Sequence, residues 1–306
     1  MQHILYLENA KQLSVNNSCL LIKDSNDQEN TIHCDDILAI VIENIYCQIT
    51  IPAMLLCVES KIPLLVCDHK HQPAIYCLDF YTHSELRKQI TEQINWPIEK
   101  QYLAWLTIIR YKLDNQLMVL RLFSPHHLAI NKITEYRQKL DQVNLVAEQI
   151  NTIESISARL YFNALFGDEF KRFELDGINA ALNYGYSIVR SVILLAITGR
   201  GLHPTLGIWH HSVRNRFNLA DDLIEILRPL VDQTVKKMML DNQQQFTRNH
   251  RQQLLSILHH PVLWQQKMVS LKNAIDHYLN DFVRFMGSEC DIISPIIWSN
   301  VEYGTD

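Results

Sequence analysis

Residues 94–123 read INWPIEKQYLAWLTIIRYKLDNQLMVLRLF, and this stretch decides the fold class. Its apolar residues recur at positions i, i+3, i+4 and i+7, which is the period of an amphipathic helix. The preceding segment, THSELRKQI, offers a helix start. The same period returns further along the chain in residues 140–150, 154–166, 178–197 and 221–240. The later part of the chain is therefore predicted to be helical.

Residues 1–80 have a different pattern. The short segments HILYLE, LSVNNSCLLIKD, NTIHCDDILAIVIEN and PLLVCD are rich in aliphatic residues, and turn residues such as VNNS and DSNDQEN interrupt them. Such segments predict β-strands. Between two of them, ITIPAMLLCVESK has helical spacing and predicts a crossover helix. Because this part of the chain contains no glycine, it excludes a glycine-rich phosphate loop.

The two patterns together predict an α+β protein with two domains. A small β-rich domain covers residues 1–82, and a larger all-α domain covers residues 83–306. The length of 306 residues and the apolar fraction of 47% suffice for a proper core. We find no internal repeat and no low-complexity tract.

The cysteines and the apolar segments of the sequence bear on the cellular location of the protein. There are seven cysteines, none in a CxxC pair, and six of them lie between positions 19 and 77. We interpret them as buried, reduced thiols, which favours the cytoplasm. The sequence has no uncharged apolar run of about 18 residues, so we expect no membrane span. The start, MQHILYLENAKQLSV, lacks the features of a secretory signal.

The net charge of −5 is unevenly distributed. Residues 1–90 contain 6 Lys and Arg against 11 Asp and Glu, so the remainder of the chain is neutral. The acidic first part suits a protein partner, whereas the second part can carry a positive groove for nucleic acid.

Glu154 is the first candidate for chemistry, and two interpretations of it remain open. It stands near the expected start of an amphipathic helix, three residues after Asn151. The simpler interpretation is therefore a capping box that also suits the helix dipole. The alternative is a functional carboxylate.

The histidine pair His210 and His211 follows GLHPTLGIW, where Pro204 and two glycines indicate a shaped loop. A histidine pair in a loop is usually polar surface. A loop held in one shape could instead aim a neutral imidazole at a metal ion.

FNLADDLIEILRP at residues 217–229 is the most informative stretch. We expect Asn218 to cap a helix on which Asp222 lies at the edge of the apolar stripe, with Glu225 beside it one turn later. Glu225 could simply pair with Arg228 on the surface. However, two carboxylates at i and i+3 beside a core face also suit a hard cation. Mg²⁺ or Mn²⁺ prefers oxygen ligands, and one added imidazole favours Mn²⁺.

Four ordered blocks resemble the CRISPR-associated integrase family, whose members are the first-numbered Cas proteins. The blocks are ESISARLYF at 154–162, NAALNYGY at 179–186, GLHPTLGIWH at 201–210 and LADDLIEILRP at 219–229. Ser155 departs from the family pattern, which most often has glycine there. The FNLADDLIE form of the last block, with His-His before it, looks most like members from type II systems.

The resemblance implies that Glu154, His210 and Glu225 are the metal ligands and catalytic residues, with Mg²⁺ or Mn²⁺ as the ion. His211 remains a register alternative. The resemblance adds the candidate supporting residues Asp222, Asn183 and Tyr184. The candidate DNA-binding residues are Arg159, Arg214 and Arg216, which could equally be exposed solubilising charges.

The implied function is a metal-dependent DNA endonuclease and integrase. The 3′-hydroxyl of a captured fragment would attack a phosphodiester at the end of a CRISPR repeat, which inserts a new spacer. The implied partners are double-stranded DNA (the fragment and the leader–repeat), a second copy of the chain bound through the β-rich domain, and a bridging dimer of the small second adaptation protein. A type II system would add its effector and accessory proteins. No membrane is expected.

Two other functions remain open. One is a catalytically silent scaffold that keeps the fold and binds DNA or partner proteins. The other is a repair nuclease for branched DNA that uses the same metal site.

Overall fold

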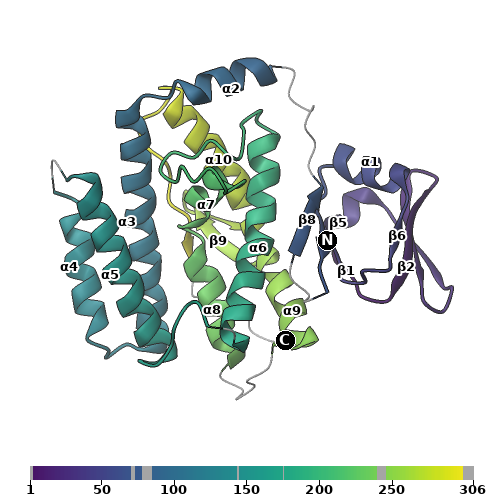
Figure 1. Cartoon of the computed structure of the whole chain (residues 1–306), viewed down its shortest axis with the longest axis horizontal. Helices are drawn as coiled ribbons and strands as arrows, with labels where there is room; N and C mark the ends of the chain where they lie inside the picture. Colours follow the sequence, from purple (N-terminus) through teal and green to yellow (C-terminus); the bar gives the residue numbers. More distant parts are fainter. Residues whose placement is uncertain are drawn as a thin grey trace. The chain divides into compact units, whose positions relative to one another are not determined.

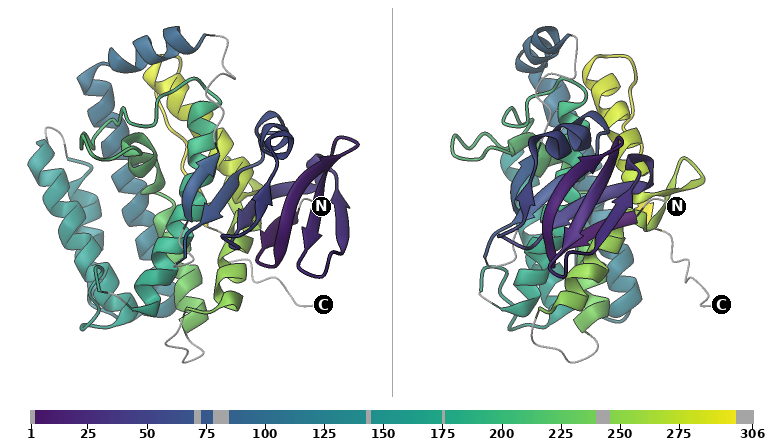
Figure 2. Two further views of the ribbon diagram at one scale, coloured as in Figure 1. Left: turned by 45° about the vertical axis from the view of Figure 1, so that its right-hand side comes forward. Right: turned by 90° about the vertical axis from the view of Figure 1, so that its right-hand side faces the viewer.

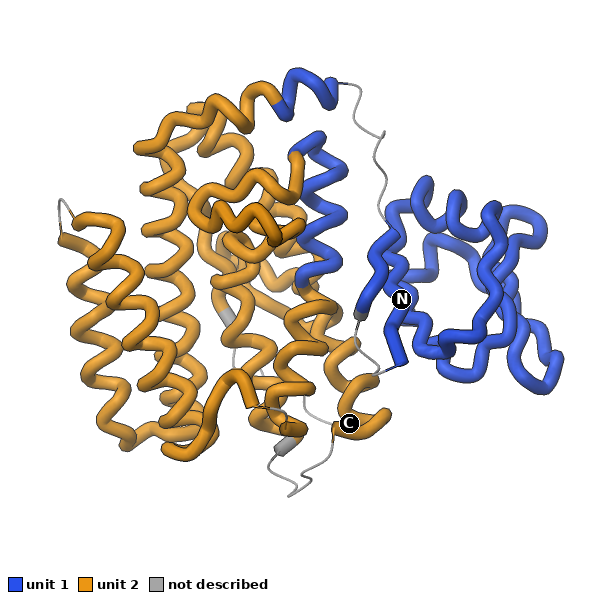
Figure 3. The backbone as a smooth tube through the Cα atoms, viewed as in Figure 1, with its two compact units in different colours: residues 1–90, 190–202 blue, residues 91–189, 203–306 orange. Residues whose placement is uncertain are grey.

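The computed structural model describes residues 3–69, 73–77, 85–142, 145–174, 176–239 and 246–298. The chain forms two compact units (Figure 3). Residues 1–90 together with 190–202 form unit 1, and residues 91–189 together with 203–306 form unit 2. The predicted boundary between residues 82 and 83 lies outside the described residues. The sequence pattern did not predict that residues 190–202 would join the first unit.

Unit 1 contains two four-stranded sheets, drawn in purple and blue in Figures 1 and 2. In the first sheet the strand order is β1-β5-β7-β8, and only β8 is antiparallel to its neighbour. In the second the order is β4-β3-β2-β6, with parallel pairing only between β2 and β6. The strands are β1 (His3–Leu7), β2 (Ala10–Asn16), β3 (Cys19–Asp24), β4 (Glu29–Ile32), β5 (Ile37–Ile42), β6 (Gln48–Ile49), β7 (Leu64–Cys67) and β8 (Pro73–Cys77).

The predicted crossover helix is confirmed as α1 (Ile51–Glu59), which connects β6 to β7. Thr50 caps it by accepting a hydrogen bond from the backbone nitrogen of Ala53, and Pro52 stands in its first turn. Strand β5 is buried along its whole length, as its unbroken apolar run requires in a parallel sheet. A short 3-10 helix (Cys34–Asp36) precedes β5.

Unit 2 is mainly helical, which confirms the predicted α+β class. Helices α3, α4 and α5 lie side by side and contact one another (Figures 1 and 2). The α-helices that follow α1 in the described residues are α2 (Leu86–Ile94), α3 (Ile98–Phe123), α4 (Ala129–Lys139), α5 (Ala147–Phe166), α6 (Gly177–Thr198), α7 (Asn218–Ile224), α8 (Arg228–Met239), α9 (Arg248–Leu255) and α10 (Leu271–Met286). Of these, α2 and α6 contribute residues to both units.

The long helix α3 supplies the buried centre of unit 2. Trp105, Ile108 and Leu113 are fully buried, as the apolar period predicts. The same helix also buries three polar side chains, Lys112, Asn115 and Gln116. Buried polar side chains need hydrogen-bond or ion-pair partners. The partners of Lys112 and Asn115 belong to the candidate site described below.

Unit 2 also contains a small three-stranded sheet that the helical period did not predict. Its order is β10-β9-β11, formed by Pro261–Trp264 (β9), Lys267–Ser270 (β10) and Ile297–Trp298 (β11). A 3-10 helix (Ser256–His259) leads into β9. The strands have two to four residues each, which is too short to show a period in the sequence.

Helix α6 is long and apolar enough to cross a membrane by length and composition, although 67% of its most apolar window is buried inside the protein. A core helix passes the same test, so this is weak evidence for a membrane span.

Candidate metal centre

Glu154 lies in the interior of α5 and not at its start. The helix begins at Ala147, two turns earlier, and Gln149 accepts a hydrogen bond from the backbone nitrogen of Val146 at that end. Asn151 accepts a hydrogen bond from the indole nitrogen of Trp209 and does not cap the helix. The capping interpretation of Glu154 is therefore wrong. Its carboxylate is not used at the start of the helix and can take part in a functional site.

Asp222 organises the loop that carries His210. Its carboxylate is fully buried and accepts hydrogen bonds from the backbone nitrogens of Ile208 (2.8 Å), Trp209 (3.0 Å) and His210 (3.1 Å). The imidazole Nδ1 of His210 lies 2.5 Å from the same carboxylate. Asp222 was expected at the edge of an apolar stripe, but it is enclosed on all sides.

The contact with Asp222 determines how His210 can bind a ligand. Because Nδ1 faces Asp222, Nε2 is the nitrogen left for a metal. The ring meets the buried Trp105 edge-on, with centroids 5.5 Å apart. The hydrogen bond to Asp222 raises the pKa of His210 above its ordinary value, although burial opposes this shift. His211 lines a different cavity from the two glutamates, whereas the charges of Glu225 and Glu154 also help to raise the pKa of His210.

Gly207 explains the shape of the same loop. A Cβ atom at this position would lie 2.7 Å from the Asp222 carboxylate and would collide with the carbonyl oxygen of His210. Only glycine lets the loop backbone approach Asp222 this closely.

The capping role predicted for Asn218 is wrong as well. Helix α7 begins at Asn218 and its N-cap residue is Phe217, which makes no side-chain cap. The Asn218 amide instead donates to the carbonyl oxygens of Thr205 and Ser212. These bonds tie the start of α7 to the histidine loop.

Glu225 follows α7 in the turn before α8 and is almost completely buried. Its Oε1 atom lies 2.9 Å from Nε of Arg228, which is the pairing that the simpler interpretation proposed. The Glu225 carboxylate is buried and the Arg228 side chain is 33% exposed, so the pair is half-buried and not on the open surface as that interpretation assumed. Burial alone would raise the pKa of Glu225, but Arg228 and Lys112 together lower it below its ordinary value.

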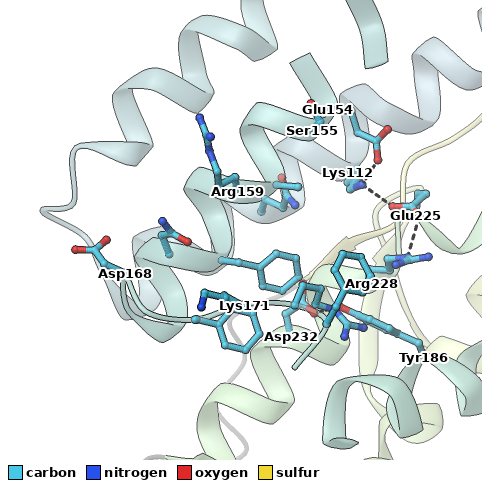
Figure 4. Close-up of a pocket in the computed structure, with 17 residues that line it drawn as sticks. Lys112, Glu154, Ser155, Arg159, Asp168, Lys171, Tyr186, Glu225, Arg228 and Asp232 are labelled. Atoms are coloured by element: carbon cyan, nitrogen blue, oxygen red, sulfur yellow. Dashed lines mark hydrogen bonds and ion pairs between the residues drawn. The ribbon is translucent and has the colours of Figure 1, made fainter. Parts of the chain in front are cut away.

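Lys112 joins two of the predicted ligands and was missed in the sequence. Its Nζ atom lies 2.6 Å from Oε1 of Glu154 and 2.6 Å from Oε2 of Glu225 (Figure 4). Burial by itself lowers the pKa of Lys112, but Glu225 and Glu154 raise it above its ordinary value, so the side chain is a cation. The available signal was a lysine on the apolar face of α3, one turn before Asn115 and Gln116.

Asn115 is a second residue that sequence reasoning missed. It is buried on α3 and donates a hydrogen bond of 2.9 Å to the carbonyl oxygen of Ile226, next to Glu225. It thereby fixes the turn that presents the Glu225 carboxylate.

Unit 2 has a cavity of about 620 Å³ (Figure 4), and His210, Asp222 and Asn115 are not among the residues that line it. Glu154, Glu225 and Lys112 lie at one part of its wall. The rest of the wall combines cations with aromatic rings, and includes Arg159, Lys171, Arg172, Arg228, Phe162, Phe170 and Phe173. A wall of this composition suits a polyanion that carries aromatic bases.

The other predicted residues lie in different places. Arg159 lines the cavity, whereas Arg216 lines the second one with His211, and Arg214 is exposed on the same loop. Asn183 accepts a hydrogen bond from Arg172, and Tyr184 is buried against Phe246. Neither Asn183 nor Tyr184 lines the cavity, so the structure does not bring these two to the ligands.

The residues present have the chemistry of a divalent-cation site. Two carboxylates converge on one point, and Oε2 of Glu225 is buried without a hydrogen bond. In the described part of the chain, no three acidic, histidine or cysteine side chains already form a group that could hold a metal. A cation at this point would replace the ammonium group of Lys112 as the partner of both carboxylates.

A second buried network borders the cavity. Asp232 on α8 accepts a hydrogen bond from the hydroxyl of Tyr186, and the guanidinium of Arg228 lies over the Tyr186 ring. Burial raises the pKa of Asp232 from its ordinary 3.8 to about 7, although its tyrosine and arginine neighbours oppose the shift.

This raised pKa predicts a pH dependence of stability. The contribution of Asp232 is fully present below its unfolded pKa of 3.8 and is lost as the pH rises through about 7. Between pH 5 and pH 8, the wild type should lose about 2 kcal/mol of unfolding free energy relative to Asp232→Asn. Urea unfolding of both proteins at the two pH values measures the difference. An unchanged difference would contradict the raised pKa.

An α+β chain whose helical unit opens a cavity with carboxylates and several cations has side chains of the class that suits phosphate esters. Comparison with known proteins identifies the family of this chain. Residues 5–257 match the family described as CRISPR associated protein Cas1. The chain belongs to the Cas1 family.

Individual relatives agree with this assignment. The chain is 33% identical over 282 residues to the CRISPR-associated endonuclease Cas1 of Neisseria meningitidis serogroup C (strain 8013), covering 91% of this chain and 90% of the relative. Its fold is similar to a casposase bound to integration product, with a TM-score of 0.78 and 20% identity over 99% of this chain and 95% of the other. It is also similar to part of a Cas6-RT-Cas1–Cas2 complex, with a TM-score of 0.73 and 17% identity over 98% of this chain and 36% of that chain.

Proposed function

We propose that this chain is a metal-dependent DNA endonuclease and integrase that inserts DNA fragments as new spacers into a CRISPR array. Membership of the Cas1 family supports this proposal, and the Neisseria relative is described as an endonuclease. The observation that carries the proposal is the convergence of the Glu154 and Glu225 carboxylates on one point in a cavity lined by cations.

Glu154, His210 and Glu225 would hold one Mn²⁺ or Mg²⁺ ion. When bound, such an ion would stabilise negative charge on the scissile phosphate and favour the attacking hydroxyl. Asp222 would keep His210 in the tautomer whose Nε2 faces the site. Asn115 and Arg228 would keep the Glu225 carboxylate in place.

The remaining wall of the cavity would bind the DNA strand. Arg159, Lys171 and Arg172 can contact phosphates, and Phe162 and Phe170 offer faces for unpaired bases. The reaction would then be attack of the fragment's 3′-hydroxyl on a phosphodiester at the repeat end. Arg216, which lines the second cavity, and the exposed Arg214 would contact DNA outside this cavity.

The proposed partners follow from the family and from unit 1. A solved structure similar in fold contains Cas1 with Cas2, so we propose Cas2 as the small bridging partner. Unit 1 exposes Ile45, Tyr46, Ile51 and Leu55, and this apolar surface suits contact with a second copy of the chain.

The seven cysteines are free thiols, in keeping with a cytoplasmic location. The type II assignment, with its effector and accessory proteins, rests on the FNLADDLIE stretch.

A strand-transfer assay tests the proposed function. The purified chain is mixed with Cas2, a short DNA fragment with free 3′-hydroxyls and a plasmid that carries a leader and repeat. We expect insertion with Mn²⁺ and none with a chelator. Glu154→Ala should lower insertion by at least about 100-fold, because one of the ligands is lost. Glu148→Ala, an exposed glutamate on the same helix, should leave insertion unchanged.

The same assay separates the alternatives. Equal insertion by the wild type and Glu154→Ala would exclude the proposed catalytic site. DNA binding without any insertion would indicate a silent scaffold. Cleavage of branched DNA in preference to insertion at the leader–repeat would indicate a repair nuclease.

A further inference from the structure

Lys112 occupies the point on which the two predicted glutamate ligands converge. Its side chain is only 7% exposed, and its ammonium nitrogen lies 2.6 Å from an oxygen of each glutamate. It donates a hydrogen bond to Glu154, whereas its approach to Glu225 is an ion pair without hydrogen-bond geometry. The ammonium group therefore stands where a cation shared by both carboxylates would stand.

The charges around this point nearly cancel. Glu154 and Glu225 contribute two negative charges, and Lys112 and Arg228 contribute two positive ones. Carboxylates bind a divalent ion well when their negative charge is not already neutralised, so this cluster alone should bind one weakly.

DNA changes this balance. Lys112 lines the same cavity as Arg159 and Lys171, so a phosphate in the cavity would lie within the field of its ammonium group. The phosphate adds a negative charge for the metal. It also offers Lys112 a new partner, which releases one oxygen on each glutamate.

We propose that Lys112 is a built-in counter-ion that keeps metal affinity low until a DNA phosphate enters the cavity. Metal and DNA then bind cooperatively, and the coupling is reciprocal. This inference rests on the proposed metal site at Glu154, His210 and Glu225. Its consequence is a nuclease site that holds its catalytic ion mainly when substrate is present.

The test is Mn²⁺ binding to the full chain, measured by calorimetry with and without a DNA duplex whose 3′ ends lack hydroxyls. For the wild type, the DNA should tighten Mn²⁺ binding by at least about tenfold. Lys112→Met should bind Mn²⁺ without DNA at least about tenfold more tightly than the wild type, because the repelling charge is gone. The added effect of DNA should shrink in this variant.

Two control variants make the test specific. Lys112→Arg keeps the positive charge and should retain weak binding without DNA. Lys132→Met removes an exposed lysine that does not line the cavity, and should behave as the wild type. If Lys112→Met is less stable without metal, Mn²⁺ should raise its melting temperature more than that of the wild type.

The proposal is overturned if Lys112→Met binds Mn²⁺ without DNA no more tightly than the wild type, or if neither protein binds it. Glu154→Ala separates this failure from failure of the metal site. If Glu154→Ala binds Mn²⁺ as the wild type does, the predicted site itself is wrong. If Glu154→Ala weakens binding but Lys112→Met has no effect, only the role of Lys112 is wrong.

Discussion

Glu225→Ala is expected to abolish strand transfer and also to lower the free energy of unfolding by about 3–5 kcal/mol. The carboxylate is almost fully buried and lies against both Lys112 and Arg228. Its removal leaves Arg228 without its carboxylate partner and Lys112 with Glu154 alone. The Lys112 side chain is only 7% exposed, and the loss of a counter-charge beside a buried cation is strongly destabilising, whereas Arg228 is 33% exposed and keeps contact with water.

Urea unfolding and the strand-transfer assay measure the two effects separately. Glu289→Ala is the matched control for stability, because Glu289 pairs with Arg284 on the surface at 3.7 Å. Its loss should change the unfolding free energy by less than about 1 kcal/mol. A similar small change for Glu225→Ala would contradict the buried ion-pair cluster.

The double variant Lys112→Met with Glu225→Gln separates stability from catalysis. It removes the buried negative charge and one of its two cations together, so it should be more stable than Glu225→Gln alone. Insertion should remain absent, because a proposed metal ligand is still missing. Recovery of insertion in the double variant would exclude Glu225 as a ligand.

The sequence predicted those elements of the fold that are long enough to show a hydrophobic period. The helical run before Phe123 became α3, and the short apolar segment after Ile49 became the crossover helix α1. The strands β9, β10 and β11 could not be predicted, because two to four residues do not establish a period. The contribution of residues 190–202 to unit 1 also depends on tertiary packing and not on local pattern.

The site was predictable only in part. The four blocks indicated Glu154, His210, Glu225 and Asp222, but local pattern misjudged their surroundings. Glu154 resembled a cap because Ala147, the first residue of α5, carries no start signal. Lys112 belongs to a different helix from either glutamate and lies far from both along the chain, so its pairing with them has no local signature.

Asp222→Ala is expected to release the histidine loop and to lower the free energy of unfolding by at least about 3 kcal/mol. Three backbone N–H groups and one imidazole nitrogen would lose a fully buried acceptor at once. A side chain of equal size should not repair the loss. Both carboxylate oxygens of Asp222 accept hydrogen bonds, so the amide group of Asp222→Asn would turn one donor toward other donors.

Three measurements on Asp222→Ala and Asp222→Asn check this prediction: urea unfolding, Mn²⁺ affinity, and the pKa of His210 by NMR. The pKa of His210 should fall in both variants, because the hydrogen bond to Asp222 is the main cause of its elevation. Mn²⁺ should bind more weakly, since His210 is no longer aimed at the site.

Asp221→Ala is the matched control, because the adjacent carboxylate accepts a hydrogen bond from the Asn215 side chain and is less buried. If Asp221→Ala and Asp222→Ala lose the same stability and leave the pKa of His210 unchanged, then Asp222 does not organise the loop, and the choice of His210 over His211 loses its structural support.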